Sequence, residues 1–323
     1  MPETVLEVKN LHTYYKILRG LVKAVDGVSF RVEKGKALGL AGESGCGKTT
    51  VALSILKILP PGGQIVKGRI LFDGLDITRM EEAEIREKVR WKGISIVFQG
   101  AMNALNPVYR IGDQIAEAII THEPDISKTD AIERAKKLLE LVGVEPSRAS
   151  NFPHEFSGGM KQRAMIAMAL ACNPKLLIAD EPGTALDVIV QAQVLKLMKE
   201  LKDRLNLSMI MISHDLSIIS EVCDDIAIMY GGKIVEYGDI YSVYKEPLHP
   251  YAKGLLESFP SITGPRKRMT SIPGSPPDLL NPPRGCRFHP RCFYAMEICK
   301  KVEPAFHPVK TAHFVACHLY QKA

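Results

Sequence analysis

The sequence lacks the long apolar segments that mark membrane-spanning chains, and its first residues do not follow the pattern of a secretory leader. No stretch of its 323 residues approaches the roughly 18 uninterrupted apolar residues that a membrane helix needs. The first residues, MPETVLEVKN, contain no basic region followed by an apolar run, so we expect no secretory signal. We therefore expect a cytoplasmic protein that works at a membrane only by docking on a partner that spans it.

A strong excess of charge of one sign is also missing. The chain has 42 basic and 36 acidic residues, which give a net charge of +6. Such a mild excess predicts a solvated surface with a slight basic bias and favours no nucleic-acid partner. Tandem repeats and low-complexity tracts are absent, and the composition is that of a globular domain, with or without an appendage.

Short apolar runs alternate with helical patterns along the first 247 residues. Residues 28–32 alternate between apolar and polar side chains, which is typical of a half-buried strand. Helices are predicted at 49–59 and 162–171, and two more within 111–143, separated at Pro124. Buried strands are predicted at 37–41, 94–98, 176–179 and 209–212. This order predicts an α/β domain with a largely parallel central sheet.

Residues 42–49, GESGCGKT, fit the GxxxxGK[ST] phosphate-loop pattern between a predicted strand and a helix. The glycines let successive backbone N–H groups surround phosphate oxygens, and the following helix directs its positive end at the same anion. Lys48 is expected to reach the β- and γ-phosphates, and the Thr49 hydroxyl to ligate Mg²⁺. Only the backbone of Cys46 is needed there. A kinase or a GTPase could share such a loop.

Asp180 and Glu181 follow the predicted strand at 176–179. An acidic residue at the end of a buried strand can hold Mg²⁺, and a second carboxylate can act as general base on a water. Acidic turn residues with no function are an equal alternative for this pair alone. Residues 157–159, Ser-Gly-Gly, open a helix and so make a second anion-binding helix end.

With these motifs the sequence resembles the ABC ATPase family. Residues 156–160, FSGGM, are similar to the LSGGQ signature, with Phe for Leu and Met for Gln. In that family two cassettes meet head to tail, and each signature closes over the ATP of the other. The resemblance implies a P-loop NTPase ABC cassette at 1–247, with a RecA-like core, a β subdomain and a helical subdomain at about 100–160, followed by an irregular C-terminal extension at 248–323.

The resemblance also assigns roles to single residues. Gln99 matches the Q-loop glutamine, Asp187 the D-loop and His214 the switch histidine, while Tyr15 is the candidate for stacking on adenine, with Tyr14 as the alternative. The implied catalytic residues are Lys48, Glu181 and His214. The implied Mg²⁺ ligands are Thr49, Gln99 and Asp180. The implied nucleotide-binding residues are Tyr15, Gly42, Ser44, Gly45, Cys46, Gly47, Lys48, Thr49, Thr50, Gln99, Ser157, Gly158, Gly159 and Asp187.

The composition changes near Leu248. Residues 260–290 hold eight of the 21 prolines, which predicts an irregular segment that wraps over a surface or links domains. The last part of the chain contains four cysteines in the spacing C-x5-C-x6-C-x17-C. Four thiolates can bind a tetrahedral zinc or a [4Fe–4S] cluster, and free thiols are less expected for four cysteines within 32 residues.

This tail is similar to the C-terminal extension of oligopeptide and dipeptide importer ATPases. The resemblance lies in residues 248–251, LHPY, in residues 271–280, and in residues 281–292, NPPRGCRFHPRC. It implies a [4Fe–4S] cluster, with zinc as the alternative, on Cys286, Cys292, Cys299 and Cys317. The sequence is more similar to the first of the two ATPase subunits in such importers than to the second. This implies a heterodimer with a second ABC ATPase.

The resemblance therefore implies the ATP-hydrolysing subunit of an ABC importer, peripheral on the cytoplasmic face of the membrane. Its partners would be the second ATPase, two integral-membrane permease subunits and, indirectly, an extracellular solute-binding protein. The solute would be a peptide, with oligosaccharides or nickel complexes still open. One alternative is a soluble ABC ATPase outside transport, but such proteins usually carry two cassettes or a long coiled-coil insertion. A zinc-dependent nucleic-acid binder is disfavoured because the tail lacks clustered aromatic and basic residues.

Overall fold

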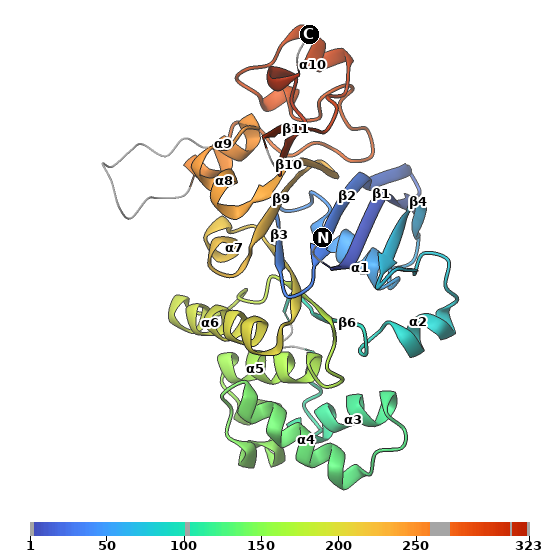
Figure 1. The fold of residues 1–323 in the computed structure, drawn as a ribbon, viewed down its shortest axis with the longest axis vertical. Coiled ribbons are helices and arrows are strands. Elements are labelled where there is room, and N and C mark those ends of the chain that lie inside the picture. Colours follow the sequence, from blue (N-terminus) through green and yellow to red (C-terminus); the bar gives the residue numbers. More distant parts are fainter. Residues whose placement is uncertain (1–2, 101–103, 259–271, 311, 322–323) are drawn as a thin grey trace. The chain divides into compact units, whose positions relative to one another are not determined.

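The computed structural model describes residues 3–100, 104–258, 272–310 and 312–321 (Figure 1). The chain divides into two compact units. Unit 1 combines Met1–Val5, Val32–Ala37 and Arg79–Ile212. Unit 2 combines Leu6–Arg31, Leu38–Thr78 and Ser213–Ala323. Each unit therefore collects segments that are far apart in the sequence.

Three parallel strands lie in unit 1, except for the last residue of β8: β6 (Ile94–Val97), β7 (Leu176–Asp180) and β8 (Ser208–Ser213). β7 pairs with both of the others. Every residue of β7 and β8 is buried. The uninterrupted apolar runs of the sequence therefore predicted these strands correctly, because a strand covered on both faces needs no polar alternation.

Helices make up most of the rest of unit 1. They are α2 (Glu82–Lys88), α3 (Ile111–His122), α4 (Lys128–Leu141), α5 (Gly158–Ala169) and α6 (Val188–Leu205), with short 3₁₀ helices at Pro146–Ser150 and Pro153–Glu155. α3 and α4 lie side by side, in green in Figure 1. The predicted break at Pro124 is confirmed, since this residue lies between them. Ser127 starts α4 by accepting a hydrogen bond from the Asp130 N–H.

The start of α5 differs from the prediction. The helix begins at Gly158 and ends at Ala169, whereas the sequence pattern placed it at 162–171. Ser157 is the N-cap, and its Oγ accepts a hydrogen bond from the Met160 N–H at 3.3 Å. The two glycines therefore belong to the first helical turn and are not part of a preceding loop.

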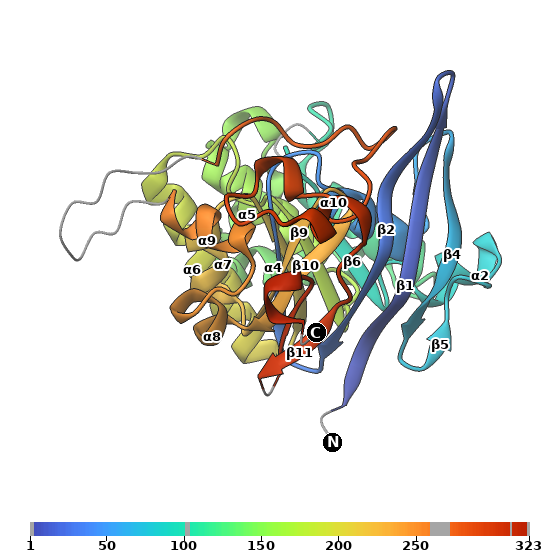
Figure 2. The ribbon, with the colours of Figure 1, turned by 90° about the horizontal axis from the view of Figure 1, so that it is seen from above.

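Unit 2 contains nearly all of a four-stranded sheet in the order β2-β1-β4-β5. The strands are β1 (Thr4–Ile17), β2 (Gly20–Glu33), β4 (Gly63–Phe72) and β5 (Leu75–Asp76), and the first three run side by side in Figure 2. β4 pairs antiparallel with β1 and with β5. Val28, Phe30 and Val32 of β2 are buried and alternate with more exposed residues, which confirms the predicted half-buried strand.

A second set of strands in unit 2 has the order β11-β12-β10-β9-β3. They are β3 (Ala37–Ala41), β9 (Asp225–Tyr230), β10 (Lys233–Asp239), β11 (His307–Lys310) and β12 (His313–Val315). β3 and β9 are parallel, and the other pairs are antiparallel. The last two strands come from the tail, which the sequence did not predict to join a sheet. The C-terminal extension thus continues the sheet through β10.

The helices of unit 2 are α1 (Lys48–Ile55), α7 (Leu216–Val222), α8 (Ile240–Lys245), α9 (Pro250–Glu257) and α10 (Glu297–Lys301), with 3₁₀ helices at His289–Arg291 and His318–Tyr320. α1 ends before the predicted residue 59, because Lys57 adopts a left-handed conformation with φ of 50°. The predicted irregular segment is confirmed over 272–288, and its residues 260–271 lie outside the described residues. In the described part of the chain, no helix is both long and apolar enough to span a membrane.

Candidate active site

The phosphate loop connects β3 to α1 and depends on two glycines that have no room for a side chain. Gly42 has φ of 146° and Gly47 has φ of 105°, both in the region that favours glycine. A Cβ atom at Gly42 would lie 2.2 Å from the Met229 carbonyl oxygen, and one at Gly47 would lie 2.1 Å from that of Ala24. The loop is therefore packed against neighbouring backbone and can exist only with glycine at these positions.

Lys48 directs its ammonium group into this loop. Its side chain is buried, and Nζ donates hydrogen bonds to the carbonyl oxygens of Gly42 at 2.6 Å and Glu43 at 3.0 Å. The Cys46 thiol lies 3.6 Å from the same nitrogen. A buried positive charge is thus held within the loop that leads into α1, and such a charge beside a helix N-terminus favours phosphate.

The two candidate aromatic residues on β1 have different surroundings. The Tyr15 hydroxyl lies 3.4 Å from Thr50 Oγ1, beside the first turn of α1. The Tyr14 hydroxyl donates a hydrogen bond of 2.7 Å to Asp26 Oδ1 and takes part in another network. Tyr15 is therefore the tyrosine that neighbours the phosphate-loop helix.

In unit 1, the carboxylate of Glu181 is held by two side chains. Gln99 Nε2 donates to Glu181 Oε2 at 2.8 Å, and Thr184 Oγ1 donates to the same oxygen at 3.0 Å. Glu181 has a left-handed backbone with φ of 47°, and its N–H donates to the Ile212 carbonyl oxygen at 2.9 Å. Asp180, at the end of β7, is only 1% exposed. The structure thus brings Gln99 and Glu181 together, and adds Thr184, which sequence reasoning missed.

The signature segment and the D-loop also meet within unit 1. Asp187 caps α6 by accepting hydrogen bonds from the N–H groups of Ile189 and Val190. A Cβ atom at Gly159 would lie 2.5 Å from Val190 Cγ1, so this glycine allows α5 to approach α6. Ser157, Gly158 and Asp187 are exposed. The N-termini of α5 and α6 therefore expose polar groups to solvent. His214, in unit 2, is also exposed and directly follows β8.

The four cysteines of the tail lie in one region of unit 2. The Cys286 N–H donates to the Cys299 carbonyl oxygen at 2.8 Å. Each sulfur faces a backbone N–H group: Cys299 Sγ faces that of Met296 at 3.5 Å, and the other three face those of Phe288, Tyr294 and Leu319. Burial and the charges of the other three cysteines raise the pKa of Cys286 to about 11. The thiols are therefore near enough to affect one another.

A metal group bound by these cysteines would need their sulfurs arranged to hold it. Across the residues that the structure describes, no set of three or more His, Cys, Asp or Glu side chains is arranged to hold a metal ion. A zinc ion needs its sulfurs at about 2.3 Å, which forces them to converge on one point. The sulfurs of a [4Fe–4S] cluster bind at its corners and converge less closely. Backbone N–H groups directed at the sulfurs suit such a cluster.

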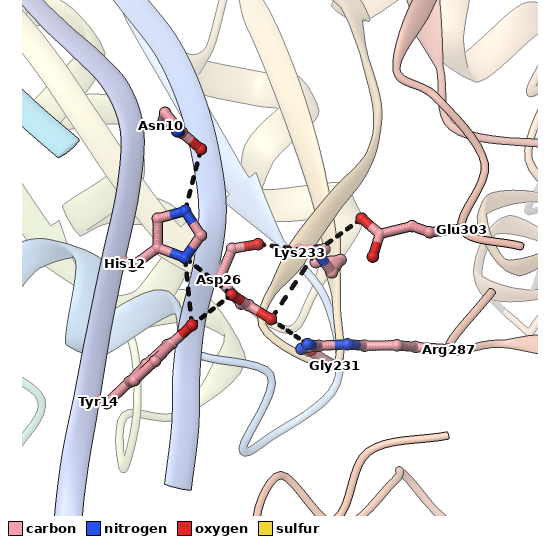
Figure 3. A network of polar contacts seen from close by, with 8 residues as sticks. All are labelled: Asn10, His12, Tyr14, Asp26, Gly231, Lys233, Arg287 and Glu303. Atoms are coloured by element: carbon pink, nitrogen blue, oxygen red, sulfur yellow. Dashed lines mark hydrogen bonds and ion pairs between the residues drawn. The ribbon is translucent and has the colours of Figure 1, made fainter. Parts of the chain in front are cut away.

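A network around Asp26 joins β1, β2, β10 and the tail (Figure 3). Asp26 accepts hydrogen bonds from Tyr14 and Arg287, and its Oδ1 lies 2.8 Å from His12 Nδ1. Lys233 Nζ donates to the Asp26 carbonyl oxygen at 3.0 Å and pairs with Glu303 at 2.7 Å. Burial raises the pKa of Asp26, but the hydrogen bond from Tyr14 and the nearby positive charges outweigh it and lower the pKa to about 2. Sequence reasoning missed this network.

A groove on unit 1 is lined by α3 and its neighbours. Its volume is about 980 Å³, and its lining includes Trp91, Asn106, Tyr109, Glu117 and Lys128. The Trp91 and His122 rings lie 5.7 Å apart at one part of this surface. The lining mixes aromatic, charged and amide side chains.

Comparison with known proteins agrees with this geometry. A family model for the ABC transporter matches residues 25–184, and one for the oligopeptide/dipeptide transporter, C-terminal region, matches residues 235–299. The chain is 42% identical over 319 residues to the dipeptide transport ATP-binding protein DppD of Caldanaerobacter subterraneus subsp. tengcongensis, and covers 98% of both chains. It is 48% identical over 314 residues to the oligopeptide transport ATP-binding protein OppD of Bacillus subtilis, covering 96% of this chain and 87% of that one.

A solved structure shares the fold. That of cbiO1 from Clostridium perfringens, described as part of the ABC transporter complex cbiONQ, matches with a TM-score of 0.65 and 27% identity, over 76% of this chain and 92% of that one. Fold and site together define a P-loop ATPase of the cassette type. Within that class, the chain belongs to the ABC transporter family, in the group of ATP-binding proteins of dipeptide and oligopeptide transport.

Proposed function

We propose that this ATPase powers the import of peptides through a membrane permease made of separate subunits. The observation that carries the proposal is the tail. Its match to the oligopeptide/dipeptide transporter region, together with relatives named for dipeptide and oligopeptide transport over nearly the whole chain, supports peptides over oligosaccharides or nickel complexes. We accordingly divide the chain into a nucleotide-binding domain at 1–247 and a C-terminal extension at 248–323.

For ATP, the proposed roles follow the chemistry of each group. Lys48 binds the phosphates with its loop-held charge, and Tyr15 stacks on the base. Hydroxyl, amide and carboxylate oxygens are the ligands that Mg²⁺ prefers, so Thr49, Gln99 and Asp180 fit that ion. The remaining nucleotide contacts are assigned to Gly42, Ser44, Gly45, Cys46, Gly47, Thr50, Ser157, Gly158, Gly159 and Asp187.

Glu181 is the proposed general base, and His214 is assigned to the γ-phosphate. A base must be held within hydrogen-bond reach of the water that it activates. The two hydrogen bonds that Glu181 Oε2 accepts from Gln99 and Thr184 fix the direction of this carboxylate. In this proposal, Gln99 therefore serves both the metal and the orientation of the base.

A second ATPase subunit would complete the site by pairing with this one. Support comes from the surface of unit 1, where the signature residues Ser157 and Gly158 are exposed. The first two residues of α6, Val188 and Ile189, are 81% and 73% exposed, although both are large and apolar. A partner cassette would bury them. We propose that the partner is a different chain, so that the pair is a heterodimer.

The groove on α3 is the proposed docking site for a cytoplasmic segment of a permease subunit. Apolar and aromatic residues of its lining, among them Trp91 and Tyr109, would receive the apolar face of a helical segment. The transporter would contain two permease subunits, and an extracellular solute-binding protein would deliver the peptide. This arrangement places the chain on the cytoplasmic face of the membrane as a peripheral protein.

The four cysteines are proposed to hold a [4Fe–4S] cluster, with a structural role in the extension. Support comes from their mutual proximity and from the backbone N–H group facing each sulfur. Four thiolates close together repel one another unless a cationic group binds them. Cys286, Cys292, Cys299 and Cys317 would be the ligands.

Uptake by membrane vesicles tests the transport proposal. The vesicles would contain the chain with its permease pair and second ATPase, and the binding protein would be added outside. We expect ATP-dependent uptake of a labelled oligopeptide, and none of a labelled oligosaccharide or of nickel. Uptake of either competitor with no peptide uptake would overturn the choice of solute.

Metal and sulfide analysis of protein purified without oxygen tests the cluster. About four irons and four sulfides per chain are expected, with a broad brown absorbance. One zinc without colour would replace the cluster by a structural zinc site, and protein with no metal would make the cysteines free thiols.

A further inference from the structure

Glu43 of the phosphate loop is bound by the C-terminal extension. Its carboxylate accepts hydrogen bonds from both terminal nitrogens of Arg291, at 2.6 Å and 2.9 Å. Its backbone N–H donates to the Tyr251 hydroxyl at 2.8 Å. Its carbonyl oxygen accepts from Lys48 Nζ at 3.0 Å. One loop residue is thus bonded to two residues of the extension and to the lysine that binds phosphate.

Arg291 is itself fixed from several sides. Its side chain is 5% exposed, and Nε donates to the Pro273 carbonyl oxygen at 2.6 Å. One terminal nitrogen also donates to the Tyr230 hydroxyl at 3.3 Å, and the guanidinium lies 5.7 Å from the centre of that ring. Arg291 therefore holds Glu43 from a rigid position and not as a mobile surface cation.

Tyr251 is held equally firmly. It is fully buried at the start of α9, with its ring centre 4.6 Å from that of Tyr230 and 5.3 Å from that of Phe288. Its hydroxyl is therefore placed by aromatic packing, and the position of the Glu43 backbone follows from it.

The strength of this contact comes from its geometry. A surface ion pair contributes little because water and salt screen it. Here one partner is buried and the contact is bidentate, which gives both directionality and strength. Loss of the Glu43 charge would leave the buried guanidinium of Arg291 without its counter-ion. The contact therefore favours one conformation of residues 42–44, where the loop begins.

We propose that Arg291 and Tyr251 are positioning residues for ATP binding, which hold the phosphate loop in its binding conformation through Glu43. Neither residue needs to touch the nucleotide. The proposal rests on the proposed role of this loop in ATP binding and adds the residues that preorganise it. It also makes the C-terminal extension a part of the nucleotide-binding apparatus.

The test measures the Kd of a fluorescent ATP analogue for the purified full-length chain. Glu43→Gln, Arg291→Gln and Tyr251→Phe are each expected to raise the Kd roughly 5- to 10-fold. The double variant of Glu43→Gln and Arg291→Gln should have a Kd no higher than that of the weaker-binding single variant, because both substitutions remove the same contact. Arg291→Lys keeps the charge but loses the bidentate geometry, and should give an intermediate Kd.

Two control variants separate the contact from general damage to the extension. Arg284→Gln removes an exposed arginine just before Cys286, and Tyr320→Phe removes a hydroxyl that bonds Lys253 at 3.5 Å. Both should leave the Kd unchanged. In the assembled transporter, the variants at Glu43 and Arg291 should raise the KM for ATP with kcat within about twofold, since uniform binding is lost and the chemistry is not.

An unchanged Kd for Glu43→Gln would overturn the proposal, as would a double variant whose effect is the product of the two single effects. If Arg291→Gln does not fold, Glu43→Gln and Tyr251→Phe decide the question, since neither changes the shape of a side chain much. The Gly47→Ala variant distinguishes the role of the phosphate loop in ATP binding from the positioning role of Arg291 and Tyr251. Loss of ATP binding in that variant with a normal Kd in Glu43→Gln would reject only the positioning role, whereas normal binding by Gly47→Ala would reject the role of the loop.

Discussion

Arg291 and Glu43 form a bidentate ion pair although they lie 248 positions apart in the chain. The first belongs to the cysteine-rich extension, and the second to the loop that begins α1. Near them, Arg287 donates to Gly231, and the neighbouring Gly232 N–H donates to the Cys46 carbonyl oxygen at 3.0 Å. The stretch between the first two tail cysteines thus contacts the phosphate loop directly and also through the turn between β9 and β10.

Gly47→Ala should abolish ATP binding. The new Cβ atom would lie 2.1 Å from the Ala24 carbonyl oxygen, at a φ of 105° that only glycine adopts readily. Gly45→Ala is the matched control, because its φ is 79° but no atom lies within 4 Å of its Cβ position. Strain alone of about 1–2 kcal/mol predicts that this variant binds ATP roughly tenfold more weakly. Equal Kd values for the two variants would contradict the packing argument.

Gln99→Ala should lower kcat for ATP hydrolysis by about 10-fold or more. The variant removes one of the two donors that direct the Glu181 carboxylate, and misplacement of a base reduces its contribution. Gln193→Ala, an exposed glutamine on α6, serves as the control and should retain full activity. The measurement is phosphate release by the assembled transporter. A rate equal to that of the unchanged protein would show that Gln99 does not position the base.

Lowering the pH should reduce the free energy of unfolding of the unchanged protein more than that of the Asp26→Asn variant. The pKa of Asp26 is about 2 in the folded chain, against 3.8 for a free aspartate. Its charge therefore contributes stability above pH 3.8, by about 2 kcal/mol at most, and this contribution disappears as the pH falls toward 2. Urea unfolding should show a large gap between the two proteins at pH 7 and a small gap near pH 2. Asp125→Asn, at an exposed site, should show no such convergence. A gap that stays constant would contradict the network.

If the four cysteines hold the proposed cluster, Cys317→Ser should release it and also weaken ATP binding. Loss of one ligand loosens the segment around Cys286, whose backbone is bonded to Cys299, and Arg291 lies in that segment. We expect iron to be lost and the ATP Kd to rise by a factor similar to that of Arg291→Gln. Cys172→Ser removes a buried cysteine of unit 1 and should keep both the iron and the affinity. Iron loss without any change in the ATP Kd would show that the cysteines do not influence the conformation of the phosphate loop.

Local features of the sequence predicted much of the fold. The buried strands β7 and β8 appeared as apolar runs, because the two covered faces of a parallel strand need no alternation. Pro124 marked the break between α3 and α4. The phosphate loop and the signature are contiguous motifs, so their residues could be named without knowledge of the fold. Element ends were less accurate, as shown by Lys57, whose left-handed backbone ends α1 early.

Contacts between distant segments could not be predicted. Nothing in the local sequence pairs Glu43 with Arg291, or places Asp26 beside Arg287, since each pair depends on how β9, β10 and the extension pack. The tail strands β11 and β12 are short, and β11 contains a proline, so neither shows a clear strand pattern in the sequence. Thr184 was missed for the same reason, because a hydroxyl three residues after Glu181 has meaning only once the turn is folded.

The assembled transporter carrying Glu181→Gln gives the most direct test of the central claim that this chain is the ATP-hydrolysing motor of a peptide importer. The variant keeps the size of the side chain and removes the base, so hydrolysis should fall by about 10²- to 10⁴-fold. ATP binding should persist, and peptide uptake should stop together with hydrolysis. Glu200→Gln, at an exposed position of α6, is the matched control and should retain both activities. Hydrolysis and uptake at the unchanged rate in Glu181→Gln would contradict the account.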